Sequence, residues 1–226
     1  MSDAQKRSYE TLYPHYCLKA DEDSAFLTTD AFDPVAFFGN NKPLAIEIGF
    51  GMGRATADIA EQNPDINYLG IEVHRPGIGR LLWEIEKRNL KNLRIIEGDA
   101  VEVLKKINDS SISSFHVFFP DPWPKKRHNK RRLITRPFTD TLAAKLLPGG
   151  FLYMVSDWAD YGEWALSELS GTPGLINKYS GFAEPVSWRP KTEFERKGLE
   201  KKHEIKELYF LKLPDNYSQK ENKDNA

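Results

Sequence analysis

The sequence predicts an α/β fold in which a mostly parallel, twisted sheet carries helices on both faces. Short apolar runs alternate five times with segments whose apolar residues recur at helical spacing, the pattern of strands joined by crossover helices. One run, 115–119, is apolar almost throughout, as expected of a strand buried on both faces. The last run, 205–213, follows no long crossover helix, so we expect it to join the sheet antiparallel.

The first five expected strands alternate along the chain with five expected helices. Strands are expected at 44–48, 68–71, 93–96, 115–119 and 151–155, and helices at 55–61, 76–85, 101–107, 138–146 and 158–169. Pro76 falls in a first helical turn, where its missing N–H costs nothing, and Pro148 with the glycines after it should end the preceding helix.

The domain organisation follows from the same periodicity. Residues 1–40 show no sustained period and are expected to be an N-terminal extension with some short structure, in which 32–38 packs. The domain itself is expected at 41–213, followed by a polar tail at 214–226.

Composition excludes several classes of protein. The chain has 226 residues, of which 40% are hydrophobic and 29% charged, so we expect a folded globular protein and not a disordered one. No apolar run approaches the ~18 residues that a membrane span requires. Cys17 is the only cysteine, which excludes an intramolecular disulfide and favours a reducing, cytoplasmic setting.

Charge is informative only in its distribution. The net charge is −1, but residues 125–132 read KKRHNKRR, with six lysines and arginines in eight positions. Such a run is commonly just a solvated face. Because it follows a candidate active-site loop, we favour phosphate binding, which would give a salt-dependent share of RNA affinity.

A glycine-rich turn follows the first expected strand. Gly49, Gly51 and Gly53 form G-x-G-x-G, which differs from the dinucleotide spacing G-x-G-x-x-G. Such glycines permit a tight turn and a close approach of backbone N–H groups to a ligand. Glu47 precedes them, and its carboxylate would repel a pyrophosphate but suit a cation. An ordinary strand–helix turn remains the alternative.

Two further acids, Glu72 and Asp99, follow the second and third strands. The carboxyl ends of parallel strands form one ligand-binding edge, where a carboxylate can hold ribose hydroxyls. Three acids at one edge fit a ligand with a positive amine, a sulfonium and hydroxyl groups, and S-adenosylmethionine is such a ligand. Asp99 alone is equally explained as a helix N-cap.

A proline-rich loop, FPDPWP at 119–124, follows the fourth strand. Each proline should push the residue before it into an extended conformation, so Asp121 is expected on a stiff loop over the same cleft. Trp123 is suited to stacking on a base, a contact worth about 1–3 kcal/mol. The alternatives are a turn aspartate bonded to its own backbone and a tryptophan packed under the loop.

These motifs resemble the bacterial tRNA (guanine-N7-)-methyltransferase family over roughly residues 40–212. The resemblance rests on LAIEIGFGMG at 44–53, GIEVHRPG at 70–77 and FFPDPWPKKRHNKRR at 118–132, together with SDW at 156–158 and TEFE at 192–195. It implies a Rossmann-like class I fold that methylates guanine N7 in the tRNA variable loop, at position 46 in standard tRNA numbering, with S-adenosylmethionine as the methyl donor.

The resemblance also implies roles for individual residues. Asp121 would be the active-site acid and a cofactor contact, together with Glu47, Glu72, Asp99 and the three glycines. Substrate contacts are implied at Lys125, Asp157, Thr192, Glu193, Phe194 and Glu195, and RNA contacts at Arg127, His128, Asn129, Lys130, Arg131 and Arg132. Thr192 to Glu195 is also a T-x-x-E capping box, and both interpretations can hold.

The sequence also bears on metals, partners and alternative functions. The five histidines lack metal-ligand spacing, so we expect no metal. The partner is expected to be tRNA, with the protein a monomer or homodimer. A methyltransferase for small molecules or proteins would not need the basic run, an RNA-binding protein with a degenerate pocket would not need the acids, and a nicotinamide oxidoreductase is disfavoured by the glycine spacing.

Overall fold

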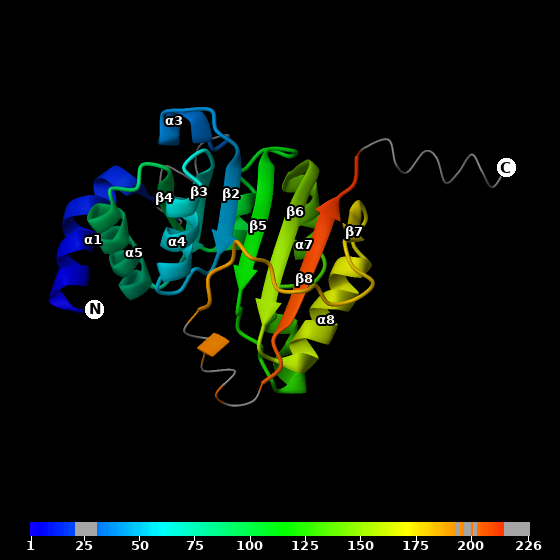
Figure 1. Cartoon of the computed structure of the whole chain (residues 1–226). Helices are drawn as coiled ribbons and strands as arrows, with labels where there is room; N and C mark the ends of the chain where they lie inside the picture. Colours follow the sequence, from blue (N-terminus) through cyan, green and yellow to red (C-terminus); the bar gives the residue numbers. More distant parts are fainter. Residues whose placement is uncertain (21–30, 193–194, 197–199, 201–202, 215–226) are drawn as a thin grey trace.

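The computed structural model describes residues 1–20, 31–192, 195–196, 200 and 203–214, and over these residues the chain forms one eight-stranded sheet (Figure 1). The sheet order is β1-β4-β3-β2-β5-β6-β8-β7. The strands are β1 Cys17–Ala20, β2 Leu44–Ile48, β3 Asn67–Glu72, β4 Leu93–Gly98, β5 Ile112–Phe118, β6 Leu146–Ser156, β7 Leu175–Asn177 and β8 Lys206–Lys212. Strands β1 to β6 pair in parallel, and β8 is antiparallel to β6 and β7. The predicted fold class, including its antiparallel last strand, is confirmed.

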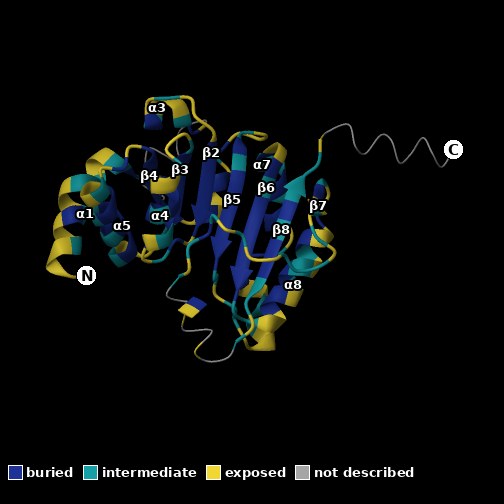
Figure 2. Cartoon of the chain, viewed as in Figure 1, coloured by how far each residue is buried: buried dark blue, intermediate teal, exposed yellow. Residues whose placement is uncertain are grey.

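Helices cover both faces of the sheet. The helices are α1 Asp3–Tyr16, α3 Pro34–Phe38, α4 Arg54–Gln62, α5 Arg75–Arg88, α6 Ala100–Leu104, α7 Phe138–Lys145 and α8 Ala159–Ser170, with a 3₁₀ helix, η1, at Lys126–Arg131. One apolar core joins the sheet to α3, α6, α7 and α8, and the other joins it to α1, α4 and α5. Figure 2 shows the strands buried between these layers.

The segment between β7 and β8 covers part of a sheet face where a helix would otherwise lie. Figure 1 shows it crossing in front of β5, β6 and β8. Its Trp188 ring stacks 4.9 Å from the buried His116 of β5 and lies 5.2 Å from Tyr153 of β6. Burial lowers the pKa of His116 to about 3, so this imidazole is a neutral part of the core. The segment is thereby anchored before it reaches the carboxyl edge of the sheet.

The N-terminal residues form regular structure that the sequence analysis did not predict. Helix α1 begins at a capping box, in which the Ser2 hydroxyl accepts the Gln5 N–H and the Gln5 side chain accepts the Ser2 N–H. Strand β1 then adds an edge to the sheet beside β4. The predicted packing of 32–38 is confirmed, because Phe32 and Phe38 are buried. The division of the chain at residue 40 stays a prediction.

One predicted boundary differs in the structure. Leu146 was expected to end a helix, but it begins β6, so Pro148 and the glycines after it lie within the strand. A register shift explains this difference, since Leu146 pairs with Ile112 while Phe151 pairs with Ser114. The bulge absorbs the extra residues, and periodicity cannot reveal it. Strand β7 was not predicted at all, because its three residues are too few to show alternation.

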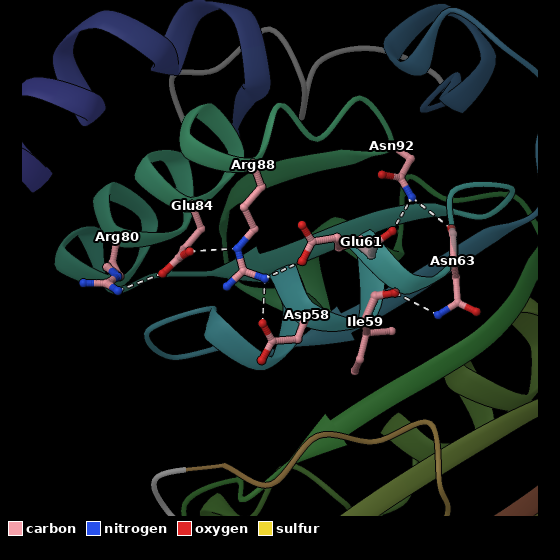
Figure 3. Close-up of polar contacts among 9 residues, drawn as sticks. Asp58, Ile59, Glu61, Asn63, Arg80, Glu84, Arg88 and Asn92 are labelled. Carbon is pink, nitrogen blue, oxygen red and sulfur yellow. Dashed lines mark hydrogen bonds and ion pairs between the residues drawn. The ribbon is translucent and has the colours of Figure 1, made fainter.

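A charged cluster fixes α4 against α5 (Figure 3). The Arg88 guanidinium donates to Asp58 at 2.6 Å, to Glu61 at 3.0 Å and to Glu84 at 2.9 Å. Its side chain is 17% exposed, so these bonds are partly shielded from water. Arg88 ends α5 and lies at the amino edge of the sheet, away from the glycine turn. Among the described residues, no helix is long and apolar enough to cross a membrane.

We expect Gly79→Ala to lower the stability of the protein. An alanine in a helix interior is normally about 1 kcal/mol better than glycine, but a Cβ at residue 79 would lie 2.6 Å from the Gln5 carbonyl oxygen of α1. The two helices would have to separate, at a cost of about 1–3 kcal/mol. Thermal melting should therefore occur about 2–12 °C lower. Gly181→Ala, whose Cβ would meet nothing within 4 Å, is the control and should melt like the wild type.

Candidate active site at the carboxyl edge of the sheet

The order of strands reverses between β2 and β5, and this switch point positions the candidate site. Adjacent parallel strands β4, β3, β2, β5 and β6 all end at one edge, where ligands of open α/β sheets bind. Asp99, Glu72, the glycine turn, the proline loop and Asp157 follow these strands in that spatial order. Lys206, which begins the antiparallel β8, pairs with Ser156, so the chain before β8 reaches the same edge.

The glycine turn needs glycine at all three predicted positions. Gly49, Gly51 and Gly53 have φ values of 72°, 57° and 70°, in the left-handed region that other residues rarely adopt. A fourth glycine was missed by sequence reasoning. A Cβ at Gly77 of α5 would lie 1.9 Å from the Gly51 carbonyl oxygen, so the helix packs directly on the turn. Its position within GIEVHRPG is the signal that could have found it.

Glu47 is an unusual acid. It is 4% exposed, and its pKa is raised to about 8, mainly by burial. The Thr56 side chain lowers this pKa, and the nearby negative charge of Glu72 raises it. In the free protein at neutral pH this carboxyl is therefore mostly protonated. A cation bound beside it would favour the charged form. Repulsion of a pyrophosphate, as expected from a fixed carboxylate, does not operate while the group is neutral.

Glu72 and Asp99 both hold backbone. Glu72 accepts the Gly51 N–H at 2.8 Å through one oxygen, and the Val73 and His74 N–H groups at 2.8 and 3.0 Å through the other. It thus ties the glycine turn to the end of β3. Asp99 accepts the Val101 N–H at 2.7 Å, which confirms the N-cap interpretation. One carboxylate oxygen performs this capping, and the side chain lies at the exposed edge.

Exposed apolar side chains accompany these acids. Met52, Val73 and Val101 are 45%, 65% and 41% exposed, and each follows the end of β2, β3 or β4 by a few residues. These three side chains were not predicted from the sequence. Large exposed apolar groups at a ligand-binding edge are suited to the faces of a planar, apolar ring.

The proline loop carries an exposed Asp121. With its three successors it lines a shallow pocket of about 230 Å³. The predicted extended conformation is wrong for two of the three residues that precede prolines, because Phe119 and Trp123 have φ values of 51° and 43°. Each such conformation costs about 1–3 kcal/mol and persists only where the surrounding structure holds it. The alternative of a turn aspartate bonded to its own backbone is not observed among the described contacts.

Trp123 is half-buried, and the basic run packs on it. The Arg131 guanidinium lies 5.0 Å from the centroid of its ring, and the His128 ring meets it edge-on at 5.9 Å. The Asn129 amide, oriented so that both bonds form, donates to the carbonyls of Trp123 and Lys125 at 3.2 Å. The indole therefore serves partly as a platform for η1.

The basic run does not form a uniform patch. Lys125, Lys126, Arg127, Lys130 and Arg131 are exposed, while His128 and Asn129 are half-buried. Arg132 is 3% exposed and donates to the Pro122 carbonyl at 3.0 Å and to the Asp160 carboxylate. The predicted RNA contact of Arg132 stays a prediction, but its guanidinium is enclosed, unlike those of the exposed cations in the run.

The chain before β8 contributes the remaining predicted residues. Thr192 accepts the Glu195 N–H at 3.1 Å, so the capping interpretation is confirmed in this half. The Glu195 carboxylate instead accepts Arg189 Nη1 at 2.6 Å, and Arg189 Nη2 donates to Glu207 of β8 at 2.5 Å. Sequence reasoning missed Arg189, which anchors the segment. Glu193 and Phe194 lie outside the described residues.

Asp157, directly after β6, lies at the same edge. Its carboxylate oxygen is 3.6 Å from His203 Nδ1, an ion pair only when the imidazole is protonated. No group of three or more histidine, cysteine or acidic side chains among the described residues is arranged to hold a metal ion.

Several named proteins are similar to this chain. A family model described as "Putative methyltransferase" matches residues 41–208. The tRNA (guanine-N(7)-)-methyltransferase of Dechloromonas aromatica is 46% identical over 213 residues, covering 94% of this chain and 84% of that protein. The protein of the same name from Treponema pallidum is 57% identical over 171 residues, covering 75% of this chain and 67% of that protein.

A solved structure supports the fold. The crystal structure of the 16S rRNA methyltransferase KamB aligns with a TM-score of 0.58 at 14% identity, covering 82% of this chain and 96% of that chain. At this identity the likeness concerns the arrangement of strands and helices.

The Glu47 carboxyl should make stability fall with rising pH. Its pKa of about 8 in the folded protein lies above the ordinary value of 4.5, so the folded state retains a proton that the unfolded state has lost. The stabilisation is complete below the unfolded pKa and is lost as pH rises through the folded one. Glu47→Gln, which stays neutral, should therefore gain urea resistance relative to the wild type between pH 5 and pH 8.5. Glu163→Gln, at an exposed site, is the control. Parallel pH profiles of wild type and Glu47→Gln would contradict this expectation.

Proposed function

The chain belongs to the tRNA (guanine-N7-)-methyltransferase family, and from this premise we propose that it transfers the methyl group of S-adenosylmethionine to N7 of guanine 46 in the tRNA variable loop. One observation carries the proposal. A single edge of the sheet brings together three groups of residues from the ends of neighbouring strands. They are the acids Glu47, Glu72 and Asp99 at the ends of β2, β3 and β4, the proline loop with Asp121 after β5, and the exposed cations of η1 that follow it.

The residues at this edge fit the methyl donor. A cationic ligand suits Glu47, which is buried and able to ionise against a positive charge, and Glu72 retains acceptor capacity beyond the three N–H groups it holds. Exposed apolar side chains beside the acids suit an adenine ring. The residues that would hold the cofactor are Glu47, Gly49, Gly51, Gly53, Glu72, Asp99 and Asp121.

The same edge offers contacts for RNA. The exposed cations Arg127, Lys130 and Arg131, with His128 and Asn129 beside them, would neutralise phosphates. Lys125, Asp157 and the segment Thr192 to Glu195 would contact the substrate next to the reacting base. These assignments are proposals, as are a cytoplasmic location and a monomeric or homodimeric state.

The chemistry asks little of the protein in proton transfer. Guanine N7 carries a lone pair and no proton at neutral pH, so no general base is required. The cofactor supplies an already activated methyl group. The protein must hold N7 in line with that group at ~3–3.5 Å, where positioning alone contributes several kcal/mol. Positive charge develops on the purine during transfer, and the exposed Asp121 carboxylate would orient the base and stabilise that charge.

A methyl-transfer assay tests the proposal. Purified protein, S-adenosylmethionine and an unmodified tRNA transcript should give 7-methylguanosine, identified by mass after digestion to nucleosides. The same transcript with adenine at position 46 is the control and should give none. Product from both transcripts would overturn the assigned position, and product from neither would overturn the assigned substrate.

We expect Asp121→Asn to lower kcat by roughly 100-fold, in the range of lost transition-state electrostatics. Because the carboxylate acts through charge and not by taking a proton, the variant should show no new pH dependence. The comparison is kcat between pH 6 and pH 9 at saturating tRNA. Asp109→Asn, an exposed acid paired with Lys145 far from this edge, should behave as wild type. Turnover by Asp121→Asn at the wild-type rate would refute the role.

A further inference from the structure

Arg132 is enclosed in a way that its seven neighbours in the basic run are not. Its side chain is fully buried. The guanidinium carbon lies 5.0 Å from the Tyr161 ring and 5.2 Å from the Trp164 ring, both on α8. A planar cation packed against two aromatic rings is held in a fixed orientation.

The same guanidinium connects α8 to the proline loop. Nε donates to the Pro122 carbonyl at 3.0 Å, next to Asp121 in the chain, and Nη2 donates to Asp160 at the start of α8. The following residues also dock on α8, since Ile134 N–H donates to the Tyr161 hydroxyl at 3.1 Å and the Trp164 indole donates to the Ile134 carbonyl at 2.8 Å. Arg132 thus packs against and pairs with residues of α8, and it also donates a hydrogen bond to the proline loop.

The loop requires such a fastening. Phe119 and Trp123, on either side of Asp121, have left-handed backbone conformations that relax unless the surrounding structure holds them. Among the described residues, the contacts that hold the loop carbonyls and amides include Phe119 N–H to Val155 O at 2.8 Å, the Asn129 amide to Trp123 O, and Arg132 to Pro122 O. Of these, only the Arg132 contact comes from a buried charge and acts on the residue adjoining Asp121.

Stability alone does not explain a charge at this position. Arg132 Nη1 is buried without a partner among the described residues, and an unsatisfied buried donor destabilises a fold. An apolar side chain packed against the two rings would avoid this cost but would leave the Pro122 carbonyl without its donor.

We propose that Arg132 is a positioning residue, which fixes Asp121 over the reacting base by donating a hydrogen bond to the Pro122 carbonyl. This inference rests on the proposed function. Arg132 is then not one of the phosphate ligands of the basic run. Arg131, its neighbour, is exposed and belongs to the RNA contacts. Two adjacent arginines in one motif therefore act on different steps.

Arg132→Lys separates the two roles because it keeps the charge and loses the planar fork. A phosphate ligand would tolerate this change. A positioning residue would not, since one ammonium cannot reach both Pro122 and Asp160 in the stacked geometry. We expect kcat to fall roughly 10–100-fold, the effect of misplacing a catalytic group by about 1 Å. The KM for tRNA and its dependence on salt should remain those of the wild type.

Two further variants frame the measurement. Arg131→Met should reduce the salt slope of tRNA binding by about 0.7, the value for one phosphate contact on a single strand. Arg88→Lys is the matched control, because Arg88 is also a shielded arginine that joins two elements but lies at the opposite edge. It should lower the melting temperature and leave kcat unchanged. If Arg132→Lys does not fold, Asp160→Asn at a 69% exposed side chain loosens the same arginine and should lower kcat in the same direction.

Amide hydrogen exchange measures how firmly the proline loop is held, and this readout does not depend on turnover. Exchange in residues 118–125 should be faster in the Arg132→Lys protein, or in its Asp160→Asn substitute, than in the wild type. If wild type yields no 7-methylguanosine, the proposed function fails, while faster exchange in the variant still supports the part of the proposal in which Arg132 holds the proline loop. Wild-type kcat and wild-type exchange in the variant, or a change confined to KM and the salt slope, would overturn the proposal.

Discussion

The reversal of strand order between β2 and β5 is the constraint on which the whole site depends. Because the chain enters β2 in the middle of the sheet and later returns to its other side at β5, the loops that follow these strands open away from each other at one edge. The glycine turn comes from one side of this crevice and the proline loop from the other. Neither loop needs to be long, because the sheet brings their strands to adjacent positions.

Burial gives similar acids different tasks at that edge. Glu47 lies inside the sheet and holds a proton at neutral pH, while Glu72 is satisfied by backbone N–H groups and keeps its neighbouring turn in place. Asp99 caps a helix, and Asp121 stands exposed on its loop. A cationic ligand bound at this edge, as proposed, would meet one group that ionises in response and others that are already fixed. The site is thereby organised before any ligand binds.

Sequence reasoning succeeded where the chain position of a residue determines its role. Strand ends, the glycine turn and the proline loop follow from spacing, and the structure places them as expected. It failed where side-chain direction decides, because spacing in a charge run does not distinguish the buried Arg132 from the exposed Arg131. Arg189 was missed for the same reason, since its partner Glu207 is distant in sequence. Strand β1 was missed because four residues at an edge carry no measurable alternation.

The basic run and the proline loop form one continuous unit, so the cations are fixed in position relative to Asp121. Helix η1 begins two residues after Pro124, and the side chains of Asn129 and Arg132 reach back to carbonyls of the loop. RNA bound to the outer face of η1, as proposed, would therefore be bound by the same segment that carries Asp121. Phosphate contacts made there would fix the substrate relative to the proposed catalytic group through only a few bonds, so affinity for the backbone and alignment of the base would arise from a single short piece of chain.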